Sequence, residues 1–330
     1  MRSLFEYDPN FGRRFIPNIK ARVEHESGGY LIRTNSSGFR CKNEFSKSKT
    51  AGRFRVAIFG DSFTAGSGVS DQYRFGDLLE DWIPDLEVFN FGMDNTGTDQ
   101  QYLIYHELMS NIECDLIVIA PWVENIRRNL EKARSWSTQD GESLFYAKPY
   151  FSIDADGLLK LHNIPVPEDP ISEVAIFREE RPRSDRLKIF IRTKLKEINP
   201  NALMWLRKFL GKKVLPEYST ERHPAWILMK AILIRWIEES HVPVLIFPIP
   251  LEEHCVGSAS PIAYQERFKE LSDPPLVHVH DPLPDMLSYP FEKRRRFWHQ
   301  NDRHCAREGH EALARSLEPA IRRLSEAQKL

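Results

Sequence analysis

Cysteine is scarce in this sequence, and its few copies are widely separated. The 330 residues include four of them, Cys41, Cys114, Cys255 and Cys305, and no two form a C-x-x-C pair. This spacing argues against a disulfide scaffold and against a cysteine zinc site. Reduced thiols in the cytoplasm fit the pattern better.

Long apolar runs are also missing. The most apolar stretch, Trp226 to Ile237, is interrupted by Lys230 and Arg235. It is much shorter than the roughly 20 residues that a membrane-spanning helix needs. Charges and prolines interrupt residues 1–20, where a signal peptide has an apolar core. We therefore expect no stable membrane insertion and a cytoplasmic location.

Neither sign of charge is in excess. The formal net charge is −1, so no overall field attracts nucleic acid or an anionic membrane, and we predict no nucleic-acid partner. The 41% hydrophobic and 28% charged fractions are those of an ordinary soluble enzyme. One local basic cluster, Lys293 to Arg296, is by default a solvated loop. The alternative is an anion-binding rim for an acidic substrate.

Sequence patterns for cofactor and metal binding are absent too. Gly60, Gly66 and Gly68 are not followed by a lysine at Walker spacing, and they do not form a G-x-G-x-x-G fingerprint. Asp94 and Asp99 have no histidine at metal-ligand spacing. The prediction is no cofactor and no metal.

The most informative segment that is present covers residues 56–68 and reads Val-Ala-Ile-Phe-Gly-Asp-Ser-Phe-Thr-Ala-Gly-Ser-Gly. The apolar run from Arg55 to Phe59 predicts a buried strand, and a helix-compatible stretch follows from about Asp71. Ser62 therefore follows the carboxyl end of a strand, where open α/β sheets carry their sites. The simpler interpretation of Ser62 is a helix N-cap without chemistry.

A serine hydroxyl becomes a nucleophile when a base reaches it and a third group orients that base. The segment Asp302-Arg303-His304 supplies both partners. We predict that His304 is the general base and that Asp302 orients it; a surface-loop histidine is the alternative. His299 lacks an aspartate at this spacing, and His310 lies inside a predicted helix, where packing is the favoured role.

Together these segments resemble the SGNH (GDSL-type) hydrolase family. Gly60 to Phe63 corresponds to the family's Gly-Asp-Ser block. Asp302 to His304, followed by Gly309-His310, corresponds to the block that holds its acid and base. The resemblance covers residues 8–130 and 240–325 and leaves the middle of the chain unmatched. It implies a serine esterase or acyltransferase with Ser62, Asp302 and His304 as the catalytic residues.

The same resemblance implies three donors for the oxyanion that forms during acyl transfer. The first is the backbone N–H of Ser62. The second is a glycine N–H, but this chain has Asn95 there, a residue type that tolerates left-handed backbone angles; Gly97 is the fallback donor. The third is an asparagine side chain. An ungapped match places Glu124 at that position, yet we favour Asn125 because a carboxylate would repel an oxyanion.

Apolar runs and helix-like segments alternate along the chain, which predicts an α/β fold. We expect a doubly wound, mainly parallel five-stranded sheet flanked by helices, in a flavodoxin-like three-layer arrangement. The predicted strands are 54–59, 86–91, 115–120, 242–248 and 276–280, and the predicted helices are 73–81, 100–111, 226–240, 261–271 and 307–324.

Three parts are expected around that sheet. Residues 1–50 form an N-terminal extension packed on the core, in which 30–34 alternates like a strand. Residues 51–130 and 226–330 form the hydrolase-like catalytic domain. Residues 131–225 form an insert after the third strand, either a cap or substrate platform or solvated filler. In the insert, Asp154 to Gly157 predicts a hairpin turn and 175–213 is helix-prone.

These observations predict a serine ester hydrolase that acts through an acyl-enzyme. The expected substrate is a small-molecule or carbohydrate ester carrying a small acyl group such as acetyl. One alternative is an O-acyltransferase that uses the same triad with a sugar or lipid hydroxyl as acceptor. Another is a binding module that keeps the fold without catalysis.

Overall fold

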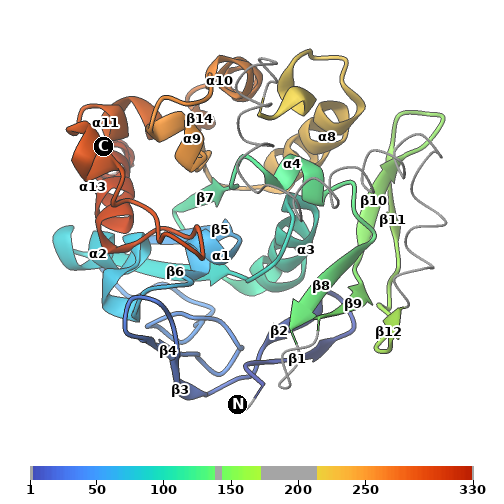
Figure 1. The fold of residues 1–330 in the computed structure, drawn as a ribbon, viewed down its shortest axis with the longest axis horizontal. Coiled ribbons are helices and arrows are strands. Elements are labelled where there is room, and N and C mark those ends of the chain that lie inside the picture. Colours follow the sequence, from blue (N-terminus) through green and yellow to red (C-terminus); the bar gives the residue numbers. More distant parts are fainter. Residues whose placement is uncertain (1–2, 138–142, 172–213, 329–330) are drawn as a thin grey trace, which may run out of the picture.

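A five-stranded parallel sheet forms the centre of the protein (Figure 1). The computed structural model describes residues 3–137, 143–171 and 214–328. The strands are β5 (Phe54–Gly60), β6 (Leu86–Gly92), β7 (Leu116–Ala120), β13 (Val244–Ile246) and β14 (Val277–Val279), hydrogen-bonded in the order β14-β13-β7-β5-β6. All four neighbouring pairs are parallel. This is the strand order of flavodoxin-like sheets, and the predicted fold class is confirmed.

Helices cover both faces of the sheet. On one face lie α2 (Phe75–Trp82) and α13 (Arg307–Ala327), and on the other lie α3 (Thr98–Leu108) and α8 (Pro224–Glu239) (Figure 1). Each predicted element is present, with ends that differ from the predicted ones by a few residues. The other helices of the described residues are short: α1 (Ser62–Ala65), α4 (Asn125–Arg128), α9 (Glu252–Cys255), α10 (Ile262–Lys269), α11 (Leu283–Leu287), α12 (Phe291–Arg294) and the 3-10 turns η1 (Asp71–Tyr73), η2 (Met109–Asn111) and η3 (Pro216–Tyr218).

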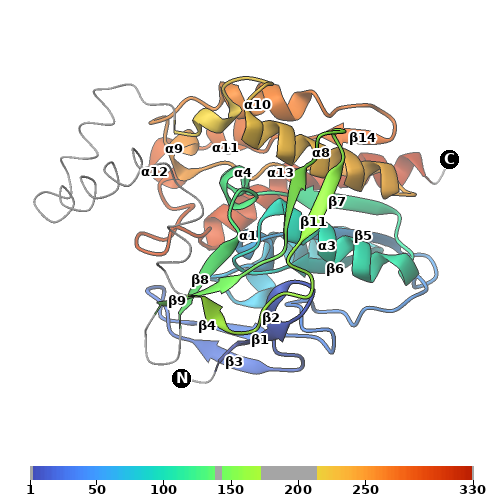
Figure 2. The same ribbon diagram turned by 90° about the vertical axis from the view of Figure 1, so that its right-hand side faces the viewer.

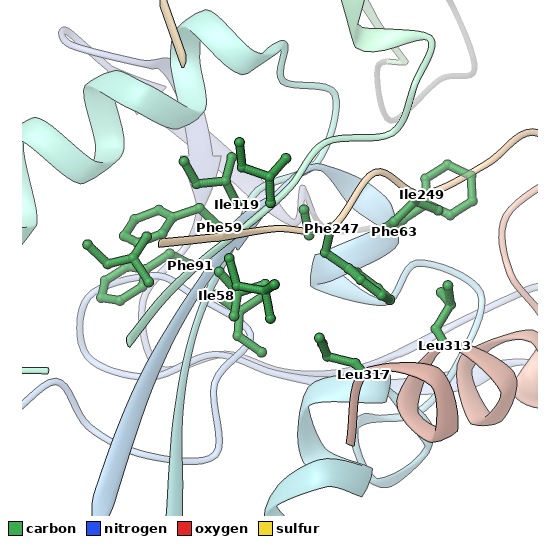
Figure 3. Packing of buried hydrophobic residues seen from close by; sticks show 14 of the residues in the cluster. Ile58, Phe59, Phe63, Phe91, Ile119, Phe247, Ile249, Leu313 and Leu317 are labelled. Carbon is green, nitrogen blue, oxygen red and sulfur yellow. The ribbon is translucent and has the colours of Figure 1, made fainter. Parts of the chain in front are cut away.

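The alternation of side chains along β5 fills both interfaces between sheet and helices. The ring of Phe59 lies 5.7 Å from Tyr105 of α3 and 5.2 Å from Trp236 of α8, measured between ring centroids. Ile58, the preceding residue, points the other way, toward Leu317 of α13 (Figure 3). All seven residues of β5 are buried, as expected for a strand covered on both faces.

Two hairpins form the N-terminal extension, and the predicted strand at 30–34 is the second strand of the second hairpin. They are β1 (Phe5–Asp8) with β2 (Gly12–Phe15), and β3 (Lys20–Val23) with β4 (Tyr30–Arg33). The segment after them packs on the edge strand β6, since Phe39 and Phe45 lie 5.6 and 4.2 Å from the ring of Phe91. The extension therefore covers one edge of the sheet.

Residues 133–171 add a second β layer outside the core. The strands β8 (Ala133–Ser137), β9 (Ser143–Ala147) and β12 (Pro170–Ile171) form one small sheet, and β10 (Tyr150–Ile153) pairs with β11 (Leu159–His162) across the predicted Asp154–Gly157 turn. Strands β8, β9 and β12 were not predicted. Figures 1 and 2 show this layer beside the β1–β2 hairpin, and Tyr7 Oη donates to the Val166 carbonyl (2.5 Å). The helix-prone segment 175–213 lies outside the described residues.

Among the residues that the structure describes, no helix has the length and apolar character needed to cross a membrane.

Candidate active site

A sharp turn after β5 delivers Ser62 to the carboxyl edge of the sheet. Asp61 caps the short helix α1, its Oδ1 accepting the Phe63 N–H at 3.0 Å, and Gly66 ends the helix in the left-handed conformation (φ 81°). Gly92 of β6 makes this packing possible, because a Cβ there would lie 2.3 Å from the backbone nitrogen of Ala65. Ser62 is the first residue of α1 and is only 5% exposed.

The loop before α13 brings His304 and Asp302 to this serine. His304 Nε2 lies 2.8 Å from Ser62 Oγ, and His304 Nδ1 lies 2.8 Å from Asp302 Oδ2. Arg303 between them has a φ of 61°, and the side chains of Asp302 and His304 on either side of it face each other. The ring of Phe63 packs 5.2 Å from the imidazole. The three residues predicted as a triad are thus in hydrogen-bond contact.

The electrostatics of the pair favour a charged carboxylate and a basic imidazole. Burial alone would raise the pKa of Asp302, but the hydrogen bond and charge of His304 lower it overall, with His25 adding to the effect. Burial alone would lower the pKa of His304, but the hydrogen bond and charge of Asp302, followed by Asp94, raise it above its ordinary value. Asp302 therefore stays ionised beside the imidazolium that forms when His304 takes a proton.

Asn95 and Gly97, the two candidate backbone donors in the loop after β6, differ in their surroundings. Asn95 has the left-handed backbone conformation (φ 62°), and its side chain is held by the Ser135 carbonyl, which accepts from Nδ2 at 2.8 Å, and by Arg134, which donates to Oδ1. No acceptor for the Asn95 N–H occurs among the described residues. The N–H of Gly97 instead donates to Gln100 Oε1 (3.3 Å), which leaves Asn95 as the more available donor.

Asn125 and Glu124 point in different directions. Asn125 is fully buried, and its Nδ2 donates at 3.2 Å to Oδ2 of Asp61, the residue before Ser62. Its Oδ1 has no partner among the described residues. The side chain of Glu124 is 35% exposed and pairs with Arg127 at 3.1 Å. Asn125 thus contacts the residue that precedes Ser62, and its role as an oxyanion donor stays a prediction.

Arg128 and Asp94 make contacts near the site that the sequence did not predict. Arg128 donates to Asp61 Oδ2 (3.0 Å) and to the Thr96 carbonyl (2.9 Å), which ties the loops after β5, β6 and β7 together. Asp94 accepts from Ser67 Oγ at 2.9 Å, and burial raises the pKa of its carboxyl. Each contact joins segments distant in the chain, so local spacing does not reveal it.

The other two histidines near the C-terminus have different environments. His310 is fully buried and stacks on Phe75, as predicted, and burial lowers its pKa to about 3. His299 packs against Gly68 and lies 4.4 Å from the ring of His25. Neither is in hydrogen-bond contact with Ser62 among the described residues.

One group in the described part of the chain has the residue types of a metal site. His25, Glu26 and His299 offer ligand atoms within 4.8 Å of one another. Both oxygens of Glu26 already accept N–H groups, from Asn301 and Asp302, and His25 Nε2 faces Asp302. A cation would compete for these atoms of His25 and Glu26, while His299 Nε2 is buried without a partner among the described residues.

Fold and site together define an α/β protein with a serine–histidine–aspartate line at the carboxyl edge of its sheet. No family model matches the chain, and no curated protein matches it in sequence. Among solved structures it is similar to a member of the lipolytic protein G-D-S-L family from Veillonella parvula DSM 2008, at 11% identity and a TM-score of 0.42, over 82% of this chain and 99% of that one. It is also similar to a two-domain esterase (CEX) active on acetylated mannans, co-crystallised with mannopentaose, at 11% identity and a TM-score of 0.41, over 83% of this chain and 50% of that one. Likeness at this level assigns no activity, so the chemistry depends on the site itself.

Proposed function

We propose that the protein is an ester hydrolase that acts through an acyl-enzyme on Ser62. The observation that carries the proposal is the unbroken hydrogen-bond line from Ser62 through His304 to Asp302, with two contacts of 2.8 Å. A hydroxyl, a base and an orienting carboxylate in this order are the parts that acyl transfer by a serine requires.

In the proposed reaction, His304 Nε2 takes the hydroxyl proton while Ser62 Oγ bonds to the ester carbonyl carbon. The carbonyl electron pair moves onto its oxygen, and the tetrahedral intermediate collapses with cleavage of the bond to the alcohol. His304 then returns its proton to the leaving alkoxide. Water attacks the acyl-enzyme with the same base, and the acid and the free serine are released.

Donors around the oxyanion supply much of the expected acceleration. The proposed set is the N–H groups of Ser62 and Asn95 and the second amide hydrogen of Asn125, the first being held by Asp61. Each well-placed donor lowers the barrier by about 3 kcal/mol, because it is aimed at charge that develops only in the transition state.

We infer a small acyl group such as acetyl, on a carbohydrate or small metabolite. Ser62 is 5% exposed, and the ring of Phe63 lies 5.2 Å from the His304 imidazole and 5.0 Å from the ring of Trp122. A crowded nucleophile accommodates a short acyl chain more readily than a long one, while the alcohol part remains outside.

The test is turnover of a series of activated esters from acetyl to octanoyl, with and without a sugar or lipid alcohol. We expect fastest turnover of acetyl, free acid as the product and no turnover by Ser62→Ala. Transfer of the acyl group to the added alcohol would assign an O-acyltransferase instead. Absence of any turnover and of any serine labelling would favour the binding-module alternative.

A further inference from the structure

The turn between β3 and β4 touches the loop that carries the proposed base. We propose that this turn, residues 24–29, is part of the active site, in which His25 and Glu26 position the Asp302 carboxylate for His304. The inference rests on the proposed function and assigns a role to an N-terminal segment far from the catalytic motifs in sequence.

The first contact comes from His25, whose Nε2 lies 3.2 Å from Asp302 Oδ2. The other ring nitrogen fixes the tautomer. His25 Nδ1 lies 3.2 Å from the backbone N–H of Ser27, which can only donate, so Nδ1 of the neutral ring is the acceptor. The ring proton is therefore on Nε2 and points at the carboxylate. Asp302 Oδ2 thus accepts from two imidazoles, His25 and His304.

The second contact holds the backbone of the same loop. Glu26 Oε1 accepts the N–H groups of Asn301 (2.9 Å) and Asp302 (3.2 Å), and Glu26 Oε2 accepts from Asn301 Nδ2 (2.7 Å). These are charge-assisted hydrogen bonds, which are stronger and more directional than those between neutral groups. They fix the peptide from which the Asp302 side chain extends.

The turn is itself anchored to the core. The ring of His25 packs edge-on against Tyr30 (5.6 Å) and His299 (4.4 Å). The backbone of Leu31 donates to Ser70 Oγ (3.0 Å), in the segment that follows the nucleophile's helix. The β3–β4 hairpin, through this turn and through Leu31 of β4, therefore bridges the two segments that carry the base and the nucleophile.

Positioning is needed here because Asp302 is not enclosed. Its side chain is 33% exposed, and it belongs to a short loop that includes the left-handed residue Arg303. An exposed carboxylate samples other rotamers and water contacts, which would let the imidazole rotate away from Ser62. Two donors on one oxygen, with the peptide held by Glu26, restrict these motions.

The experiment compares rates of Ser62 phosphonylation by a fluorophosphonate probe, with release of fluoride, in His25→Ala and His25→Gln. Loss of one hydrogen bond to a charged group predicts that His25→Ala reacts with the probe about tenfold more slowly. His25→Gln should recover most of the rate, because the glutamine amide nitrogen occupies nearly the place of Nε2 and also donates. His241→Ala, which changes an exposed histidine remote from the site, should react at the native rate.

A double-mutant cycle separates positioning from a general loss of stability. If His25 acts through Asp302, His25→Ala should cost almost nothing further in an Asp302→Ala background. Equal losses in both backgrounds would overturn the inference, as would a native rate in His25→Ala. The inference would also be overturned if the native protein and His25→Ala reacted at the same rate in EDTA. In that case a cation bound by His25, and not its hydrogen bond to Asp302, would account for the difference in rate. If Asp302→Ala itself reacts at the native rate, the proposed function fails first, so the two failures are distinguishable.

Discussion

At the scale of single residues, the account depends on where His304 can place its two ring nitrogens. One faces Ser62 and the other faces Asp302, each at 2.8 Å, so the ring can pass a proton only along this line. His299 and His310 lie within a few residues of it in sequence but lack both contacts. Geometry therefore distinguishes three histidines that composition alone does not.

The first prediction concerns these three histidines. His304→Ala should lower kcat by several orders of magnitude, because no other described base contacts Ser62. His299→Ala should have a mild effect. His310→Ala should leave the chemistry intact but cost about 2 kcal/mol or more of unfolding free energy, since it empties a fully buried position. Steady-state kinetics with thermal melts check all three; a stable but inactive His310→Ala would contradict the assignment.

The second prediction is a pH dependence. The pKa of His304 is raised: burial opposes the shift, but Asp302, then Asp94 and Asp61, outweigh it. Since only neutral His304 accepts the serine proton, kcat/KM should fall as pH drops through a value above the ordinary pKa of about 6.5. Asp94→Asn removes one raising charge, so the acid limb should move to lower pH. The test is to measure kcat/KM against pH for the native protein and for Asp94→Asn. A midpoint of the acid limb that stays unchanged or moves to higher pH in Asp94→Asn would contradict the prediction.

The third prediction separates the two candidates for the last oxyanion donor. Asn125→Ala should lower kcat by about 10² to 10³ and leave KM nearly unchanged, because the contact strengthens only in the transition state. Glu124→Gln should be nearly neutral, since Glu124 is partly exposed and pairs with Arg127. Both variants are to be measured on one activated acetyl ester. Faster turnover by Glu124→Gln with little loss in Asn125→Ala would reverse the assignment.

At the scale of elements, the serine depends on how closely α1 approaches β6. Gly92 has no side chain at the point of contact, where an added Cβ would lie 2.3 Å from Ala65 N and 2.6 Å from Thr64 C. Both are backbone atoms, so α1 itself would have to move. The position of Ser62 is thus set by a residue on the neighbouring strand.

The fourth prediction follows from this contact. Gly92→Ala should destabilise the protein by about 1–3 kcal/mol and also lower activity, because it displaces the helix that begins at Ser62. Gly76→Ala is the control: its added Cβ would meet nothing closer than Val88 at 3.4 Å, and it lies inside α2, where alanine is favoured. Chemical denaturation and ester kinetics measure both effects. A Gly92→Ala variant with the same free energy of unfolding as the native protein would contradict the close contact between Gly92 and α1.

At the scale of the whole molecule, the local sequence pattern was sufficient to predict the sheet and the place of Ser62 after β5. Continuous apolar runs such as residues 116–120 are recognisable because both faces of a parallel strand are buried. Strands such as β8 (Ala133–Ser137) were missed, since their polar and partly exposed residues give no strong alternation.

Contacts between distant segments were beyond sequence reasoning for the same physical reason. His25 and Asp302 are separated by 277 residues, and only the folded chain brings the β3–β4 hairpin to the loop before α13. The same holds for Arg128 on Asp61, which follow different strands. The motif predicted Ser62, Asp302 and His304, while the residues that support them come from tertiary structure.

The central claim is that Ser62 is the nucleophile, and covalent labelling tests it most directly. Incubation with a fluorophosphonate, followed by mass spectrometry of the digested protein, should place a single adduct on Ser62. The adduct should be absent from Ser62→Ala, whose melting temperature should stay near the native value. Full labelling or full ester turnover by a folded Ser62→Ala protein would contradict the account.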